Sequence, residues 1–147
     1  MLVRLEYNQI LSNWGEITAA IRASGPPLAD LSDEGMDRVL RAFSGDLMQC
    51  WVICEVGEDL ETIVYAIGTT MIWEDVIVFE RNLLIFSLYA YRLVPQDLWR
   101  DSFETLRKYA RSVNCKNIVA FTVVDKIVDI VKVLGGSVNT RLVKMEV

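Results

Sequence analysis

Apolar and polar residues follow two different periods in the first 28 positions of the chain. Residues 1–7 alternate between two sets with a period of two, and this alternation predicts a short strand. From Ile10 onward the period becomes helical, until Gly25 and the two prolines after it end the predicted helix. The helical stripe consists of Ile10, Trp14, Ile17 and Ile21.

A second helix is predicted after the proline pair. Ser32 or Asp33 can cap it by accepting hydrogen bonds from its first N–H groups, and Gly45 is suited to its end. The apolar stripe of this helix comprises Met36, Val39, Leu40 and Phe43. The first third of the chain therefore contributes one strand and two helices.

Residues 47–91 change character, because β-branched and aromatic residues become frequent there. Four apolar runs, LMQCWVICEV, TIVYAIGTTMIW, VIVF and LLIFSLYAY, are punctuated by the polar triplets GED, WED and ERN. This arrangement predicts three or four consecutive strands in an antiparallel meander. The last run, Leu83–Tyr91, is apolar on both faces except at Ser87, which is typical of a central strand covered on both sides.

A helix of about five turns follows, with charged residues opposite its apolar seam. Asn114 is suited to stop this helix, and the next apolar run, NIVAFTVV, predicts a buried strand. Because a helix crosses over between them, this strand should pair in parallel with Leu83–Tyr91. The seam of the long helix is Trp99, Phe103, Leu106, Ala110 and Val113.

The end of the chain predicts one more helix and one more strand. Asp125 can cap the helix KIVDIVKVL, which Gly135 and Gly136 break, and TRLVKMEV at residues 140–147 alternates as a strand does. The inward-facing residues of that helix are Ile127, Ile130, Val131 and Leu134. The predicted order is β-α-α-β-β-β-α-β-α-β, an α/β (α+β) fold in which a mixed sheet joins an antiparallel meander to a parallel β-α-β crossover.

Composition limits the chemistry. A chain of 147 residues, 52% of them hydrophobic, suits one domain with one core, so we expect a single domain over residues 1–147. The net charge of −5 disfavours nucleic acid as a partner. The chain has no histidine, which removes the commonest general base and most zinc sites. The acidic residues are dispersed, so no metal site is predicted.

The cysteines and the apolar runs bear on location. Cys50, Cys54 and Cys115 form no C-x-x-C pair and mostly lie in apolar surroundings, which indicates a reducing environment. The N-terminus does not have the pattern of a signal peptide, and no apolar run approaches the ~20 residues of a membrane span. We therefore expect a protein of the cytoplasm, or of the interior of a viral particle, without a membrane partner.

One stretch carries a specific resemblance: LLIFSLYAYRLVPQDLWRDSFETLRKYARSVNCKNIVAFTVVDKIVDIVKVLGGSV, from Leu83 to Val138. It follows the plan of a central strand, a ligand loop, a long helix, a strand, a short helix and a glycine turn. In this plan the chain resembles the GCN5-related N-acetyltransferase (GNAT) family over nearly its whole length, and best from Leu83 onward. The resemblance implies the GNAT fold, acetyl-CoA as cofactor and N-acyl transfer as activity.

The ligand loop departs from the family pattern. Glycines in the family's loop let a pyrophosphate approach the backbone N–H groups at a helix N-terminus. Here the loop is Leu93–Trp99, without glycine; Pro95 removes an N–H donor, and Asp97 brings a negative charge or caps the helix itself. If acyl-CoA binds, the resemblance assigns its contacts to Tyr91, Arg92, Gln96 and Arg100.

The catalytic positions depart as well. The place of the family's acidic tyrosine is taken by Val131, which cannot donate a proton, and the aromatic residue of the glycine turn is replaced by Gly136. Tyr89 and Tyr91 share one face of the central strand, where a core or rim tyrosine is the ordinary interpretation. No catalytic residue is assigned, because the remaining base candidates sit at strand ends beside turns, where carboxylates are usually solvated: Glu55, Glu74 and Glu80.

Three hypotheses follow. The first is a GNAT-like domain that has lost acyl-CoA-dependent catalysis, needs no cofactor, and serves as a binding or structural component, as phage-encoded and virion-associated members do. The second is an atypical acyl-CoA-dependent N-acyltransferase that uses acetyl-CoA. The third is an α/β domain that self-associates through residues 47–56 or through its final strand. In every version we expect a protein partner or a homo-oligomer.

Overall fold

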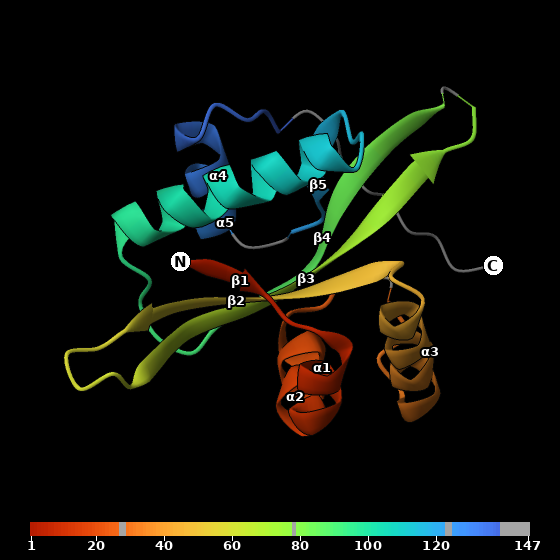
Figure 1. Ribbon diagram of the computed structural model, residues 1–147. Coiled ribbons are helices and arrows are strands. Elements are labelled where there is room, and N and C mark those ends of the chain that lie inside the picture. The colour runs from red at the N-terminus through yellow and green to blue at the C-terminus, as the bar shows by residue number, and fades with distance from the viewer. Residues whose placement is uncertain (27–28, 78, 123–124, 139–147) are drawn as a thin grey trace.

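The computed structural model describes residues 1–26, 29–77, 79–122 and 125–138. Its centre is a five-stranded sheet in the order β1-β2-β3-β4-β5 (Figure 1). Neighbouring strands are antiparallel, except that β4 and β5 are parallel, so the predicted mixed sheet and its crossover are confirmed. The strands are β1 (Leu2–Arg4), β2 (Met48–Val56), β3 (Thr62–Asp75), β4 (Glu80–Ala90) and β5 (Asn117–Ala120).

The first predicted helix is two helices, α1 (Tyr7–Ser12) and α2 (Trp14–Ser24). They separate at Asn13, whose φ of −114° and ψ of 19° leave the helical range. The Asn13 side-chain amide donates to the carbonyl oxygen of Gln9 at 2.8 Å, which satisfies an acceptor at the end of α1. The apolar spacing continues through the break, and for that reason the sequence pattern suggested one helix.

The second predicted helix is α3 (Asp33–Ser44). Of the two cap residues predicted from the sequence, Ser32 is the N-cap, and its hydroxyl accepts a hydrogen bond from the N–H of Gly35 at 3.2 Å. Gly45 stands at the C-cap. Both ends of this helix therefore follow from local sequence.

The meander contains three strands, within the predicted three or four. Two of the expected turns are wrong: Trp73–Asp75 ends β3, and Glu80–Asn82 begins β4. The reason is cross-strand pairing, because Glu74 lies opposite Arg81 and forms an ion pair with it at 2.9 Å. The hairpin between β3 and β4 consequently projects far from the helices (Figure 1).

The sheet separates two apolar layers (Figure 1). Residues of α1, α2 and α3 pack on one face against Met48 and Cys50 of β2 and Ile67 of β3. On the other face α4 (Gln96–Ser112) packs against Trp51 and Ile53 of β2. Strand β2 pairs with β3 along its whole length and with β1 at Trp51–Ile53, so the middle of residues 47–56 is covered on both sides.

Helix α4 ends where the sequence predicts. Val113 is its C-cap, and Asn114 follows with a φ of 59°, a left-handed conformation that asparagine tolerates. The predicted seam is rotated by one position at the start of the helix, because Trp99 and Phe103 are only half-buried. The fully buried positions are Leu98, Ser102, Leu106 and Ala110.

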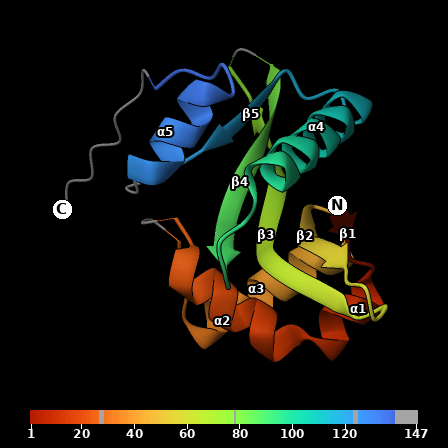
Figure 2. The same cartoon turned by 90° about the vertical axis from the view of Figure 1, so that its left-hand side faces the viewer.

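Strand β5 is shorter than the predicted run at residues 117–124, since it ends at Ala120. Helix α5 (Asp125–Val133) follows, with Asp125 as its first residue, and the chain then leaves the helix at Gly135, where φ is 82°. Figure 2 shows β5 between α4 and α5. The predicted strand at residues 140–147 lies outside the described residues.

Candidate functional site

Strand β4 continues beyond its pairing with β5. The last parallel pair joins Ile85 to Ala120, whereas β4 runs on to Ala90 in register with β3. The register of β3 against β4 shifts between Thr69 and Thr70, as at a β-bulge. The sheet therefore opens on the β5 side of β4, just before the chain turns into α4, and we call this place the opening.

Backbone groups of β4 face the opening. The N–H of Tyr91 donates to the carbonyl of Tyr65 at 2.9 Å, and hydrogen-bonded pairs alternate along an antiparallel ladder. The N–H and C=O groups of Leu88 and Ala90 are consequently directed away from β3. A ligand with amide groups can bond to them as a neighbouring strand would.

The N-terminus of α4 lies at the end of the same strand and has no side-chain cap. Pro95 is the N-cap residue, and its carbonyl accepts the N–H of Trp99 at 3.0 Å. The N–H groups of Gln96, Asp97 and Leu98 belong to the first turn, where an α-helix provides no internal acceptors. Pro95 itself has no N–H to donate, as the sequence predicts, and because it stands at the N-cap it leaves the three N–H groups of the first turn in place.

Asp97 does not cap the helix. Its side chain is 93% exposed, and its Oδ1 lies 3.7 Å from Nη1 of Arg100. The exposed carboxylate stabilises the helix, because its negative charge interacts with the positive end of the helix dipole. It would also repel an anionic ligand that approaches the same N–H groups.

Only one residue of the loop before α4 fills the corner. Val94 is buried against Ile53, Ala66 and Leu98, whereas Leu93 is 80% exposed. The first turn of α4 remains accessible beside this buried valine, since Gln96 and Asp97 are both exposed.

The four residues that the resemblance assigns to the cofactor lie at this junction but do not form one cluster. Tyr91 packs edge to face on Tyr89, with ring centroids 5.2 Å apart. Tyr89 lies opposite Ile67, which packs in the core layer of α2, so the Tyr89–Tyr91 pair lies on the α2 side of the sheet. Burial raises the pKa of Tyr91. Arg92, Gln96 and Arg100 lie on the α4 side or at its start.

A cluster that the sequence did not predict lies beside Arg92. The Tyr65 hydroxyl donates to Oε2 of Glu55 at 2.8 Å, and the Arg92 guanidinium lies over the Tyr65 ring, 5.9 Å from its centroid. The hydrogen bond to Glu55 is the main cause that raises the pKa of Tyr65. Glu55 lies on β2, Tyr65 on β3 and Arg92 in the loop after β4, so the pairing of the strands brings together residues that are far apart in sequence.

Two of the three carboxylates considered as bases have structural partners. Glu74 pairs with Arg81, and Glu80 pairs with Lys116. Glu80 is the first residue of β4, and Glu74 lies opposite Arg81, the second. The opening lies at the other end of β4, about 30 Å away, because a strand rises ~3.3 Å per residue. Only Glu55 remains near the opening.

The position of the family's acid is part of a tight helix end. Gly136 donates its N–H to the carbonyl of Val131 at 2.8 Å, and a Cβ at Gly136 would stand 2.5 Å from Cγ1 of Val131. The carbonyl of Leu134 accepts a hydrogen bond from Nη2 of Arg107 at 3.0 Å, which joins α5 to α4. Val131 therefore has a structural role: its carbonyl closes the turn at the end of α5, and its side chain packs against Gly136.

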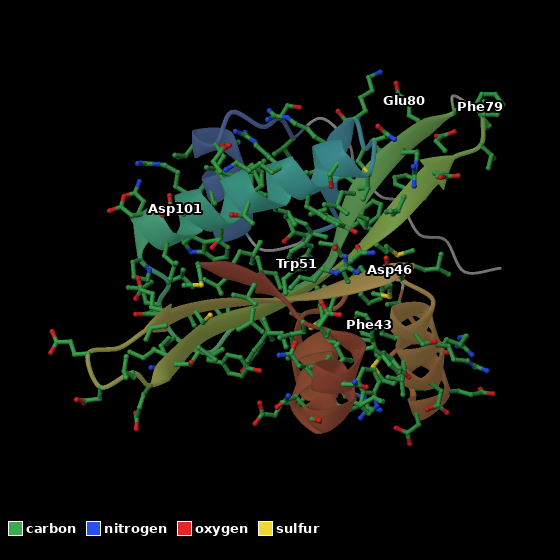
Figure 3. The ribbon with its side chains drawn as sticks, in the orientation of Figure 1. Phe43, Asp46, Trp51, Phe79, Glu80 and Asp101 are labelled. Atoms are coloured by element: carbon green, nitrogen blue, oxygen red, sulfur yellow. The ribbon has the colours of Figure 1, made fainter. Side chains whose placement is uncertain are left out.

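A small cavity lies between α4 and the sheet. Its volume is about 70 Å³, and Leu88 and Trp99 form the part of its wall nearest the junction. Trp51, labelled in Figure 3, lies beneath α4 at the centre of this layer. The other lining residues are Leu2, Ile53, Gly68, Thr69, Thr70, Ile85, Ser87, Ser102, Phe103 and Leu106.

Thiol, metal and membrane chemistry contribute little to the described part of the chain. All three cysteines are buried and free, and burial raises the pKa of Cys50 to about 12. No group of three or more potential metal ligands occurs among the described residues. Within the same residues, no helix has the length and apolar character to cross a membrane.

Comparisons with known proteins define the class of fold. No family pattern matches the sequence, and no curated protein matches it by sequence. An acetyltransferase of Trypanosoma brucei is 16% identical, with 100% of this chain and 99% of that chain covered and a TM-score of 0.63. Glucosamine-6-phosphate N-acetyltransferase from Arabidopsis thaliana is 18% identical, with 99% of this chain and 97% of that chain covered and a TM-score of 0.64.

A third similar structure was solved with acetyl-CoA. This predicted acetyltransferase from Clostridium acetobutylicum is 11% identical, with 99% of this chain and 95% of that chain covered and a TM-score of 0.68. The present chain therefore has a GNAT-like fold, as its strand order also requires.

Proposed function

We propose that this GNAT-like domain binds a coenzyme A thioester at the β4–α4 junction and has lost the acid-assisted acyl transfer of its structural relatives. The observation that carries the proposal is the uncapped N-terminus of α4 at the end of the opened strand β4. Backbone N–H groups at such a helix end attract a phosphate group. This proposal differs from the first sequence-based hypothesis, in which the domain needs no cofactor.

Binding at this place is favoured by geometry more than by charge. Arg92 and Arg100 supply two cations, whereas Asp97, Asp101 and Glu55 supply three anions nearby. Asp101, labelled in Figure 3, points away from the sheet at the start of α4. The pyrophosphate therefore depends on the N–H groups and the helix dipole, and we expect a weak, salt-sensitive complex.

The loss of transfer is argued from proton chemistry. Release of a thiolate needs a proton donor within hydrogen-bond reach, or one water away. Val131 stands at the place of the family's donor, and the side chains that line the cavity beneath α4 are apolar or carry neutral hydroxyl groups. A bound thioester would therefore lack the usual acid.

A titration with two readouts tests the proposal. Acetyl-CoA and CoA are added to the purified chain while unfolding is followed, and ligand at 100 times its dissociation constant should stabilise the fold by about 2.7 kcal/mol. Free thiol is measured in parallel with a panel of primary amines, and we expect none above the background rate. No shift at millimolar ligand would refute binding, and amine-dependent thiol release would refute the loss of transfer.

Matched variants locate the ligand. Arg92→Gln and Arg100→Gln should weaken CoA binding, because each removes a cation next to the first turn of α4. Arg111→Gln is the control, since Arg111 lies in the last turn of the same helix and is also exposed. Equal losses in all three variants would indicate a nonspecific charge effect.

The second candidate is an atypical N-acyltransferase, and the Tyr65–Glu55 hydrogen bond favours it. Glu55 can accept a proton from an amine, and Tyr65 is a proton donor beside Arg92. If thiol release with amines is found, Glu55→Gln and Tyr65→Phe should each abolish most of it. Release that survives both changes would exclude this pair as the proton-transfer groups.

We also propose that the domain associates with a protein partner or with a second copy. Strand β1 covers Trp51–Ile53 in the middle of residues 47–56, and we assign the contact instead to the tip of the β3–β4 hairpin. Val76, Ile77 and Phe79 are 79%, 85% and 88% exposed, and Phe79 points outward in Figure 3. Contiguous exposed apolar residues are typical of interaction sites. The role within a viral particle stays a prediction.

A further inference from the structure

Helices α2 and α3, which lie on the face of the sheet opposite α4, leave a hollow between them (Figure 1). Its volume is about 390 Å³, which lies within the roughly 300–1,000 Å³ of ligand-binding clefts. Along α2 it extends from Trp14 to Arg22, about 12 Å because a helix rises ~1.5 Å per residue. We call it the α2–α3 hollow, and it shares no residue with the cavity beneath α4. Its lining residues are Trp14, Gly15, Thr18, Arg22, Asp33, Met36 and Asp37.

Asp37 brings a free carboxylate to the hollow. The other acid, Asp33, forms an ion pair with Arg22 at 2.5 Å, and Arg22 also donates its Nε–H to the carbonyl of Leu31 at 3.0 Å. Asp37 forms no ion pair or hydrogen bond with any described residue, although Arg41 lies one turn later on the same helix. The hollow therefore has one carboxylate whose charge is not neutralised within the described part of the chain.

An aromatic ring and a thioether form the apolar part of the hollow. Trp14 is half-buried: its ring meets that of Phe43 edge to face, with centroids 6.2 Å apart, and it also lines the hollow. Met36 is 3% exposed and lies at the base. A cation is attracted to the face of an indole ring, and the attraction grows as water is excluded. The side chains around Asp37 are thus suited to hold a cation beside its carboxylate.

A glycine keeps one end of the hollow open. Gly15 is the second residue of α2, although glycine is a poor helix former. A Cβ at this position would meet no atom of the rest of the domain within 4 Å, so no contact inside the domain requires a glycine here. Glycine does allow another molecule to approach the backbone closely. Its presence beside Trp14 fits the entry of a group from outside.

These features select a guanidinium group among cations. A guanidinium is planar, so it can stack on an indole ring and donate two parallel hydrogen bonds to one carboxylate. A lysine ammonium is a strongly hydrated point charge that cannot form this pair of contacts. Because the hollow is open along two helices, a side chain that projects from another protein can enter it.

We propose that the α2–α3 hollow binds an arginine side chain of a protein partner, with the guanidinium stacked on Trp14 and hydrogen-bonded to the carboxylate of Asp37. Charge complementarity assigns this occupant, since Asp37 has no cationic partner among the described residues. The hollow is separate from the β4–α4 junction and from the hairpin tip. The assignment therefore stands whether or not the domain binds coenzyme A or associates through the tip.

Nuclear magnetic resonance tests the site, with the indole N–H signal of Trp14 as the reporter, identified by its loss in Trp14→Phe. The probes are the N-acetyl methylamides of arginine, of lysine and of citrulline, which has the shape of arginine without its charge. We expect a dissociation constant of roughly 1–10 mM for the arginine probe, and affinities about three- to tenfold weaker for lysine and more than about tenfold weaker for citrulline.

Each contrary result overturns one part of the proposal. Equal affinity for the arginine and lysine probes would overturn the selection of a guanidinium, and equal affinity for citrulline would overturn the role of charge. No shift of the Trp14 signal with the arginine probe at about 50 mM would overturn the site itself.

A peptide distinguishes a protein partner from a free guanidinium compound. An alanine-rich helical peptide with one central arginine should bind at least about tenfold more tightly than the arginine probe, because its other side chains contact α2 and α3 along the hollow. Equal affinity of the peptide and the probe would overturn the assignment to a protein partner.

Substitutions locate the contact. Asp37→Asn should weaken binding of the arginine probe by about 5- to 10-fold. Glu34→Gln is the matched control, because Glu34 is exposed on the same helix and does not line the hollow. Gly15→Leu should fill the hollow and abolish binding, whereas Gly15→Ala should keep it, and both should fold because the added Cβ has free space. An equal loss in Glu34→Gln and Asp37→Asn would overturn the role of Asp37.

Discussion

The indole N–H of Trp51 donates a hydrogen bond to the Thr70 hydroxyl over 2.9 Å, in the layer between the sheet and α4. The same hydroxyl donates to Oε1 of Gln49, so one threonine satisfies two buried side chains. Ser102 lines the same cavity with its hydroxyl unpaired. The Thr70 and Ser102 hydroxyl groups should therefore contribute very differently to the stability of the ligand-free protein.

Thr70→Val should lower the free energy of unfolding by about 2–4 kcal/mol, because it leaves both the Trp51 N–H and the Gln49 amide oxygen buried and unpaired. Ser102→Ala should leave that free energy within about 0.5 kcal/mol of the original value, or raise it, since it removes a group without a partner. Urea denaturation measures both. Similar losses in the two variants would show that Ser102 has a structural partner.

Asp97→Asn should have opposite effects on stability and on binding. Loss of the carboxylate next to the α4 N-terminus should cost the free protein about 0.3–1 kcal/mol of stability. Removal of the same charge should tighten CoA binding by about two- to fivefold, because the carboxylate no longer repels the phosphates at the helix N-terminus. The comparison is Glu104→Gln, two turns into the helix, where Glu104 pairs with Arg107. If Asp97→Asn weakens binding, the phosphates do not sit at this helix end.

The buried thiol of Cys50 should make the fold sensitive to alkali. Burial raises the pKa of Cys50 from 9.0 to about 12, so the folded state favours the protonated thiol. Its contribution to stability is complete below pH 9 and is lost as the pH rises toward about 12. We expect Cys50→Ala to lose less stability than the original chain between pH 9 and about 11. Parallel curves for the two proteins would contradict this link.

Burial raises the pKa values of Tyr109 and Cys115 in the same direction. Cys50→Ala should therefore retain part of the alkaline loss rather than abolish it. Urea denaturation at several pH values provides the curves.

The hairpin tip should combine local strain with self-association or partner binding. Phe79 has a φ of 54°, a left-handed conformation that bulky residues rarely adopt and asparagine tolerates. Phe79→Asn should therefore raise the free energy of unfolding by about 1 kcal/mol and reduce any concentration-dependent association. Light scattering over a range of concentrations measures the second effect.

Ile77→Asn is the control for the tip. It removes a similarly exposed apolar side chain, and Ile77 is not among the residues with positive φ. It should reduce association without raising stability. A chain that remains monomeric at every concentration would argue against self-association through the tip and leave a different protein as its partner.

Local sequence signals were sufficient wherever one element depends on its own residues. The Ser32 cap and the Asn114 stop follow from side chains that act within one turn of their own position. The parallel pairing of β4 with β5 follows from the helix between them. The expected turn at Glu80–Asn82 was wrong because a pairing partner, Asp75, lies across the hairpin and not next to it in sequence.

The candidate site was predictable in position and not in detail. The loop before α4 was identified from its place in the element order, and the lack of glycines is a fact of the sequence. Whether Pro95 stands before or inside the first turn depends on where the helix begins, which is the least certain boundary in any sequence pattern. The Glu55–Tyr65–Arg92 cluster had no signal at all, because its members share no local motif.

By itself, the sequence determined the order of helices and strands, the absence of histidine chemistry and the departure of the ligand loop from its family pattern, because these depend on residue type and spacing. The tertiary structure decided the opening beside β4, the free N-terminus of α4 and the burial of the unpaired Ser102 hydroxyl. These features depend on strand register and on the packing of a helix against a sheet. Such contacts join residues that are far apart along the chain, and no local pattern encodes them.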